Sequence, residues 1–166
     1  MFGSEARAAM GTGQAQNSGA TNLRLSRREK HDLVEQLSAF DAFNKCTRDD
    51  LGALVDAGKP FTLPANWALI AEGAAAESFY AITRGQARVY RGRVQVAELG
   101  PGSVVGEMAL LTGRPRQATV TSSSRLAGVR IGNDVITELF AHHPHLLQAL
   151  REVFEAHLAA QPTAAP

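Results

Sequence analysis

Three shortages limit what this protein can be: it has one cysteine, no long apolar run and almost no net charge. Because Cys46 is the sole cysteine among 166 residues, the chain cannot form an internal disulfide, which fits a reducing compartment. No apolar stretch approaches the roughly 18–20 residues of a membrane-spanning helix, and the N-terminus lacks the basic-then-apolar pattern of a secretory signal. We therefore expect a cytoplasmic chain that does not itself insert into a membrane.

The charge balance and the motif content argue against two further classes. The 17 basic and 16 acidic residues give a formal net charge of +1, which supplies neither the strongly basic face of a nucleic-acid-binding protein nor an acidic tail. The sequence contains no nucleophile elbow, zinc-protease motif or comparable catalytic pattern. We predict that the protein does not bind nucleic acid and is not an enzyme.

Length and composition predict one folded domain. With 166 residues and 45% hydrophobic content, the chain can bury a core without disulfides or metals. Its first 20 residues contain few large apolar side chains, so we expect disorder there or an artificial extension. The predicted divisions are this segment at 1–20, a helical segment at 21–60, a β-roll at 61–131 that includes a distinctive segment at 104–120, C-terminal helices at 132–160 and a frayed tail at 161–166.

Hydrophobic spacing predicts helices on both sides of the β region. Apolar residues recur every three or four positions over 26–40. Thr47 begins a second helix, with Asp50 in place of the glutamate that usually completes a capping box. After the β region, Asn133 is the expected N-cap of a further helix, and Pro144 suits the first turn of the last one.

Short extended stretches separated by glycine and proline turns fill the middle of the chain. The predicted strands are 61–63, 68–71, 78–83, 86–90, 94–98, 104–105 and 117–131. Many short strands at close spacing are typical of a small antiparallel roll. The predicted fold is therefore mainly β, an antiparallel β-roll or jelly roll flanked by N-terminal and C-terminal helices.

Residues 104–120 combine groups that suit a phosphorylated sugar. Gly106 and Glu107 stand at the start of a short apolar turn, and Arg116 follows a Gly/Pro loop. The free N–H groups of a helix N-terminus suit a phosphate, and a guanidinium can clamp two phosphate oxygens. An ionised glutamate only accepts hydrogen bonds, which suits a sugar hydroxyl. The segment therefore predicts a sugar-phosphate pocket.

This segment resembles the phosphate-binding cassette of the cyclic-nucleotide-binding domain family, which includes protein kinase A regulatory subunits, the catabolite activator protein and cyclic-nucleotide-gated channels. The family signature is an apolar residue, Gly, Glu, any residue, a small residue and an apolar residue, followed after a short loop by Arg, a Ser/Thr/Ala/Gln residue and Ala. Every one of these positions is met between Val105 and Ser122. Ala74 and Ala81 depart from the family pattern outside the expected pocket. The resemblance covers about residues 35–158, with further matching segments at 37–43, 69–73 and 79–85.

The resemblance implies a cyclic-nucleotide sensor and assigns roles to individual residues. Glu107 is expected to accept from the ribose 2′-hydroxyl and Arg116 to bind the cyclic phosphate. The backbone N–H groups expected along the sugar-phosphate are those of Gly106, Ala109, Gln117 and Ala118, and the apolar contacts expected near the base are Val89, Val104 and Met108. The family closes a hinged C-terminal lid helix over the base, for which Leu150, Phe154 and His157 are the candidates, His157 for a polar or stacking contact. No metal or cofactor is implied.

The ligand and the effector remain open at this stage. cAMP is favoured over cGMP because cGMP-selective relatives often carry Thr or Ser where this chain has Gln117. The chain is the regulatory domain of an enzyme, the cytosolic gating domain of a cyclic-nucleotide-gated channel, a sensor that acts through an unknown protein partner, or a degenerate roll that serves only as an interaction module. It ends soon after the last helix, so we expect no helix-turn-helix.

Three features of the sequence also have a less specific explanation. Glu107 and Arg116 could form an ordinary salt bridge with each other. Arg114, in the loop between a glycine and a proline, is expected to be exposed rather than a second phosphate ligand. The histidines at 142, 143 and 145 look like a metal motif but straddle Pro144 with irregular spacing. We predict a helix-to-helix turn there and no metal site.

Overall fold

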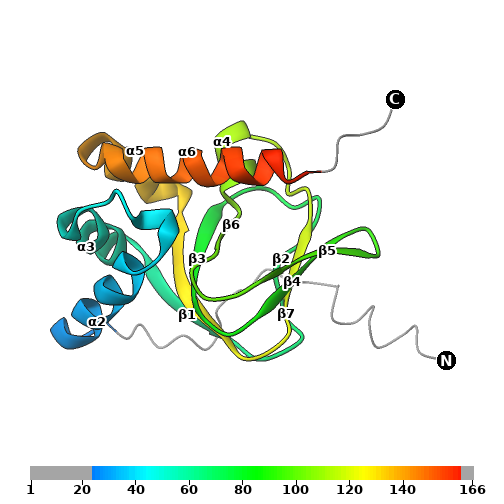
Figure 1. The fold of residues 1–166 in the computed structure, drawn as a ribbon, viewed down its shortest axis with the longest axis horizontal. Helices are drawn as coiled ribbons and strands as arrows, with labels where there is room; N and C mark the ends of the chain where they lie inside the picture. The colour runs from blue at the N-terminus through cyan, green and yellow to red at the C-terminus, as the bar shows by residue number, and fades with distance from the viewer. Residues whose placement is uncertain (1–23, 162–166) are drawn as a thin grey trace.

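The computed structural model describes residues 24–161, so the expectations for 1–20 and for most of the tail lie outside the described residues. Helices gather at one end of the molecule and a β-roll forms the other (Figure 1). The helical elements are α2 (Arg27–Ser38), η1 (Asp41–Phe43), α3 (Arg48–Ala57), α4 (Glu107–Thr112), α5 (Asn133–His142) and α6 (Pro144–Ala159). The strands are β1 (Lys59–Leu63), β2 (Ala68–Ile70), β3 (Ser78–Arg84), β4 (Ala87–Arg91), β5 (Val94–Leu99), β6 (Val104–Val105), β7 (Thr119–Ser122) and β8 (Leu126–Gly132).

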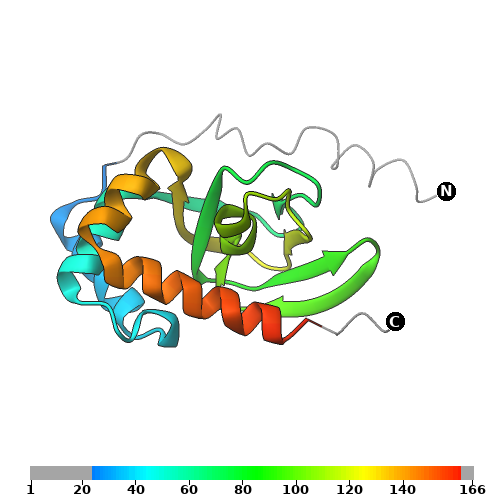
Figure 2. The ribbon, with the colours of Figure 1, turned by 90° about the horizontal axis from the view of Figure 1, so that it is seen from above.

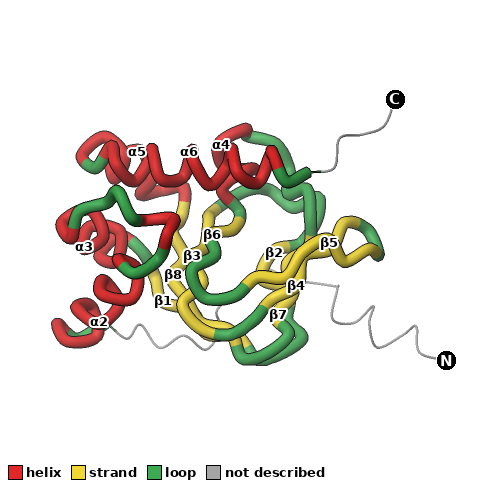
Figure 3. Tube along the Cα trace, in the orientation of Figure 1, coloured by secondary structure: helices red, strands yellow, loops and turns green. Residues whose placement is uncertain are grey.

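The strands form two four-stranded antiparallel sheets, in the orders β1-β8-β3-β6 and β2-β7-β4-β5. Figure 3 shows the strands wrapped into the roll, with the helices beside and above it. The predicted antiparallel roll with flanking helices is confirmed. None of the helices within 24–161 has the length and apolarity needed to cross a membrane.

The prediction of one long strand at 117–131 was wrong, because the chain turns between β7 and β8 and passes from one sheet to the other. Serines make this turn. The backbone N–H of Ser123 donates to the carbonyl of Gln86 at 2.9 Å, and the hydroxyl of Ser124 accepts from the N–H of Gln86, also at 2.9 Å. Local side-chain hydrogen bonds of this kind compete with strand pairing.

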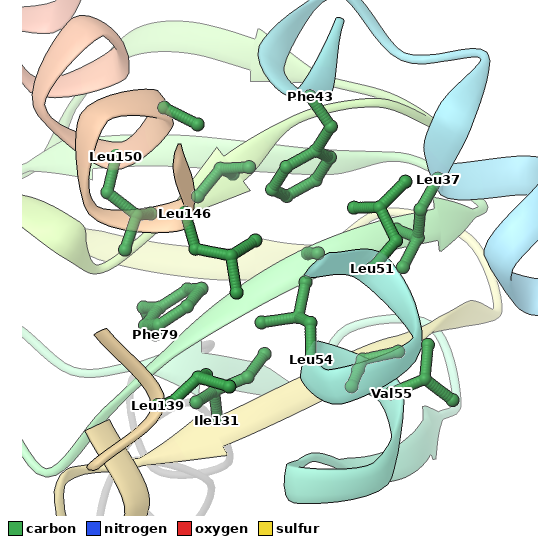
Figure 4. Close-up of a cluster of buried hydrophobic side chains, with 14 residues drawn as sticks. Leu37, Phe43, Leu51, Leu54, Val55, Phe79, Ile131, Leu139, Leu146 and Leu150 are labelled. Atoms are coloured by element: carbon green, nitrogen blue, oxygen red, sulfur yellow. The ribbon is translucent and has the colours of Figure 1, made fainter. Parts of the chain in front are cut away.

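Strand β3 separates two hydrophobic cores. Successive side chains of a strand point to opposite faces, so Phe79 and Ala81 join one core while Tyr80 and Ile82 join the other. The first, which we call the helical core (Figure 4), consists of Leu37, Phe43, Leu51, Leu54, Val55, Phe79, Ala81, Val104, Val129, Ile131, Leu139, Leu146, Ala149 and Leu150. The second, the roll core, consists of Leu69, Ile70, Tyr80, Ile82, Ala87, Val105, Val120 and Leu126.

Most of the predicted helix starts are confirmed. Thr47 and Asp50 form the reciprocal capping box at the start of α3, and Pro144 is in the first turn of α6. The prediction for Asn133 was wrong, because Gly132 is the N-cap of α5 and makes no side-chain hydrogen bond. The Asn133 side chain instead donates from Nδ2 to the carbonyl of Ala76 at 2.6 Å, which ties α5 to the loop before β3.

A buried carboxylate joins the N-terminal helices to the turn between α5 and α6. Asp50 is 5% exposed and lies 3.0 Å from Nδ1 of both His143 and His145. Two of the three histidines considered for a metal site thus bind this aspartate across the helix-to-helix turn. Burial by itself raises the pKa of Asp50, but the Thr47 N–H, His143 and His145 outweigh it and lower that pKa to about 2.

We predict that Asp50→Asn lowers the free energy of unfolding by about 2 kcal/mol at pH 7, because the native contacts depress the pKa of this carboxyl from 3.8 to about 2. The folded state has the lower pKa. This stability is therefore present above about pH 4 and is lost as the pH falls toward about 2. Urea unfolding at several pH values measures the difference between the two proteins.

The matched control is Asp49→Asn, because Asp49 is exposed in the same helical turn. It should change the free energy of unfolding by less than about 0.5 kcal/mol. Equal losses in the two variants would show that the histidine contacts of Asp50 contribute no stability.

Candidate functional site

The segment 104–120, called the cassette below, runs from β6 through α4 and a loop into β7. Two glycines in the left-handed region bound α4: Gly106, its N-cap, has φ 87°, and Gly113, its C-cap, has φ 69°. Residues with a Cβ avoid this region. Glycine at both caps therefore lets the chain turn into and out of α4.

Arg116 is a buried cation held by backbone carbonyls. It is 7% exposed; its Nη1 donates to the Gly106 carbonyl at 2.7 Å and its Nη2 to the Ser78 carbonyl at 2.5 Å. No carboxylate oxygen in residues 24–161 lies within 4.0 Å of it. The salt bridge with Glu107, considered from the sequence, is therefore not formed. Burial of this charge lowers the pKa of Arg116. Such a charge is costly without a counter-ion, so the position suits an anionic ligand.

The loop after Arg116 adds backbone donors to this side of the cassette. Among the backbone hydrogen bonds of the described residues, none has the N–H of Gln117 or Ala118 as its donor. Both residues line the same pocket as Arg116. Neighbouring free N–H groups and a guanidinium form a concave anion site.

Glu107 contributes a buried acceptor to the same pocket. It is 1% exposed, and its Oε1 accepts a hydrogen bond from Nδ1 of His157 in α6. Its Oε2 is buried and has no hydrogen-bond partner among the described residues. The hydrogen bond from His157 to Glu107 raises the pKa of the imidazole, although burial acts in the opposite direction. Because an unpaired buried carboxylate oxygen is costly, Oε2 suits a hydroxyl donor.

These groups open into a pocket of about 310 Å³, at the lower end of the roughly 300–1,000 Å³ of small-molecule sites. The cassette, the sheet of β2, β7, β4 and β5, and the end of α6 form its walls. Arg91 of β4 is the third charged side chain on it, besides Glu107 and Arg116. The full lining consists of Ile70, Val89, Arg91, Val96, Ala97, Leu99, Val105, Gly106, Glu107, Met108, Ala109, Arg116, Gln117, Ala118, Val120, His157, Ala160 and Gln161.

The structure brings most of the sequence-predicted site residues to this pocket: Val89, Gly106, Glu107, Met108, Ala109, Arg116, Gln117, Ala118 and His157. Three others lie elsewhere. Val104 and Leu150 are buried in the helical core, and half-buried Phe154 is not part of the lining. Val104 was misplaced because strand side chains alternate: its neighbour Val105 faces the roll core and the pocket.

Sequence reasoning missed several lining residues. Arg91 could have been predicted from Val89, because the two residues are two positions apart on one strand and therefore share a face. No signal marked Val96 and Ala97, since β5 is largely exposed along its length and lies at the edge of its sheet. Gln161 fell within the predicted tail, yet its Nε2 lies 3.6 Å from Sδ of Met108.

Helix α6 connects the two halves of the molecule. Its first half carries Leu146 and Leu150 into the helical core, and further along it packs against α4. Figure 2, the view from above, shows α6 crossing from the helical end toward the β4–β5 hairpin. The contact predicted between His157 and a base is a hydrogen bond to Glu107 in this structure. The C-terminal helix thus reaches the cassette directly.

Comparison with known proteins identifies related domains. A family model described as cyclic nucleotide-binding domain matches residues 60–143. The chain is 36% identical over 109 residues to a cAMP-dependent protein kinase regulatory subunit of Yarrowia lipolytica, covering 60% of this chain and 29% of the relative. Identity to the protein of the same name from Eremothecium gossypii is 39% over 97 residues, covering 58% of this chain and 21% of the relative. The chain thus spans less than a third of these relatives.

Solved structures share the fold. The regulatory domain of Toxoplasma gondii PKA, crystallised with cAMP, superposes with a TM-score of 0.62 at 29% identity, covering 70% of this chain and 46% of that one. A cAMP-binding acyltransferase from Mycobacterium smegmatis superposes with a TM-score of 0.59 at 25% identity, covering 79% of this chain and 42% of that one.

We predict that Gly106→Ala destabilises the protein more than Gly113→Ala. Both glycines have positive φ, which costs alanine about 1–2 kcal/mol. A Cβ on Gly106 would also lie 2.6 Å from Nη1 of Arg116, whereas a Cβ on Gly113 meets nothing within 4 Å. Displacement of buried groups adds about 1–3 kcal/mol. Urea unfolding of the two variants isolates this second cost, and equal losses would show that the Arg116 side chain yields freely.

Proposed function

Because this chain belongs to the cyclic nucleotide-binding domain family, we propose that its pocket binds cAMP in preference to cGMP and that it regulates an effector rather than catalysing a reaction. The observation that carries this proposal is a pair of unsatisfied buried groups on one pocket wall. Among the residues that the structure describes, Arg116 has no carboxylate oxygen within 4.0 Å and Oε2 of Glu107 has no donor. A cyclic nucleotide supplies both an anion and a hydroxyl.

The charges on this wall allow one orientation of the nucleotide. The cyclic phosphate lies against Arg116 and the N–H groups of Gln117 and Ala118, where bidentate charge-assisted hydrogen bonds are available. The ribose 2′-hydroxyl donates to Oε2 of Glu107, which repels the phosphate and thereby sets the orientation. The base extends toward Val89 and the neighbouring apolar lining.

Two observations support cAMP as the ligand. The curated relatives at 36% and 39% identity are named as cAMP-dependent protein kinase regulatory subunits, and the Toxoplasma gondii domain at 29% identity was crystallised with cAMP. The residue after the arginine is Gln117, which lacks the Thr or Ser hydroxyl that we associate with cGMP selectivity. Binding of cGMP is therefore expected to be weaker.

We propose a regulatory role in which α6 carries the signal. The ligand bridges the cassette and the end of α6, since His157, Ala160 and Gln161 line the same pocket as Arg116. A ligand shifts a conformational equilibrium only through its different affinities for the two states, and contact with both elements provides that difference. The effector is another protein or a fused domain. The relatives named as regulatory subunits support this role over that of an interaction module without a ligand.

We predict that Arg116→Ala weakens cAMP binding at least about 100-fold, because it removes two charge-assisted hydrogen bonds of about 1.5–3 kcal/mol each. Calorimetric titration with cAMP and cGMP, after unfolding and refolding to remove bound nucleotide, measures this. Arg114→Ala is the matched control, because Arg114 is exposed in the same loop and lies outside the pocket lining. It should bind cAMP within about twofold of the wild type.

A folded wild-type protein that binds neither nucleotide would contradict the proposed function. Unchanged affinity of the Arg116 variant, with binding intact in the wild type, would place the phosphate elsewhere in the pocket.

A further inference from the structure

One hydrogen bond in the pocket joins helix α6 to the acidic residue of the cassette. His157, in the last turn of α6, reaches Glu107 at the start of α4 across 50 residues of sequence. Its side chain is 39% exposed and that of Glu107 is 1% exposed. Helix α6 thus donates a hydrogen bond to the carboxylate that is expected to bind the ribose.

The hydrogen bond from His157 restricts the rotation of the Glu107 carboxylate. His157 is the only described side chain that hydrogen-bonds to Glu107, and it occupies Oε1 while Oε2 has no partner. A second residue that binds one oxygen of a carboxylate restricts its rotation and therefore sets where the other oxygen points. Without His157, no described side chain would fix the orientation of this carboxylate.

Two arginines share the pocket lining with Glu107. Glu107 is the sole acid in the pocket lining, which also holds Arg116 from the cassette loop and Arg91 from β4. Glu107 therefore supplies the acidic acceptor of the pocket, and His157 uses only one of its two oxygens.

We propose that His157 is a positioning residue for ribose recognition: it binds Oε1 of Glu107 and thereby aims Oε2 at the 2′-hydroxyl of the nucleotide. This inference rests on the proposed function, since it requires a cyclic nucleotide with its ribose at Glu107. It also makes α6 part of the ribose site, so that binding of the sugar and the position of the helix depend on each other.

The test compares cAMP with 2′-deoxy-cAMP, which lacks only the hydroxyl in question. In the wild type, loss of a hydrogen bond to a charged group should raise the Kd about 10-fold or more. In His157→Ala, the Kd for cAMP should rise and that for 2′-deoxy-cAMP should change less than about twofold, so the ratio of the two falls to about 3 or below. A purely structural role for His157 would weaken both ligands equally and leave the ratio unchanged.

His157→Asn supplies the conservative rescue. Its side-chain N–H stands at the same number of bonds from the backbone as Nδ1 of histidine, so it should restore a ratio well above that of the alanine variant. Leu158→Ala is the control on the same helix, because Leu158 is 53% exposed, and it should keep the wild-type ratio. Circular dichroism verifies that each variant is folded.

The outcomes separate the inference from the function on which it rests. A wild-type protein that binds neither ligand defeats the proposed function. Wild-type discrimination that persists in His157→Ala overturns the inference alone. Tighter binding of both ligands by that variant also overturns it, because the contact would then oppose binding.

Discussion

The site depends on a buried arginine that has no counter-anion among residues 24–161. Arg116 is held by the carbonyls of Gly106 and Ser78, which neutralise only part of its charge. The φ of 87° at Gly106 places one of these carbonyls, and the absence of a Cβ there leaves room for the guanidinium. The cassette therefore keeps a cation largely out of water beside the pocket, where an anionic ligand would interact with it more strongly than the partners of an exposed charge pair do with each other.

A second constraint links this pocket to the helices. Strand β3 contributes alternate side chains to the helical core and the roll core, so neither half can shift without disturbing packing in the other. Helix α6 is anchored in the helical core by Leu146 and Leu150 and ends at the pocket with His157. The contacts of Asp50 with His143 and His145 hold the start of α6 against α3. Helix α6 thus connects the pocket to the packing around the N-terminal helices.

Much of the fold and of the site was predictable because the signals are local. The capping box at Thr47 and the Pro144 start of α6 each depend on residues within one helical turn. The cassette holds its buried glutamate and arginine within a dozen residues, so their proximity follows from the chain itself. The failures concern side-chain direction: Val104 and Leu150 were expected at the ligand and lie in the helical core. A sequence does not reveal which face of a short buried strand meets a pocket.

The sequence by itself determined the class of fold, the cassette and the two residue types, a glutamate and an arginine, on which the site depends. These follow from spacing, turn chemistry and hydrogen-bonding capacity, which are properties of neighbouring residues. Only the tertiary structure decided that Arg116 and Glu107 do not pair with each other and that His157 does bind Glu107. The first outcome depends on the Gly106 and Ser78 carbonyls that bind Arg116, and the second depends on how α6 packs across α4. Contacts between segments this far apart in the sequence are set by the cores they share rather than by either segment alone.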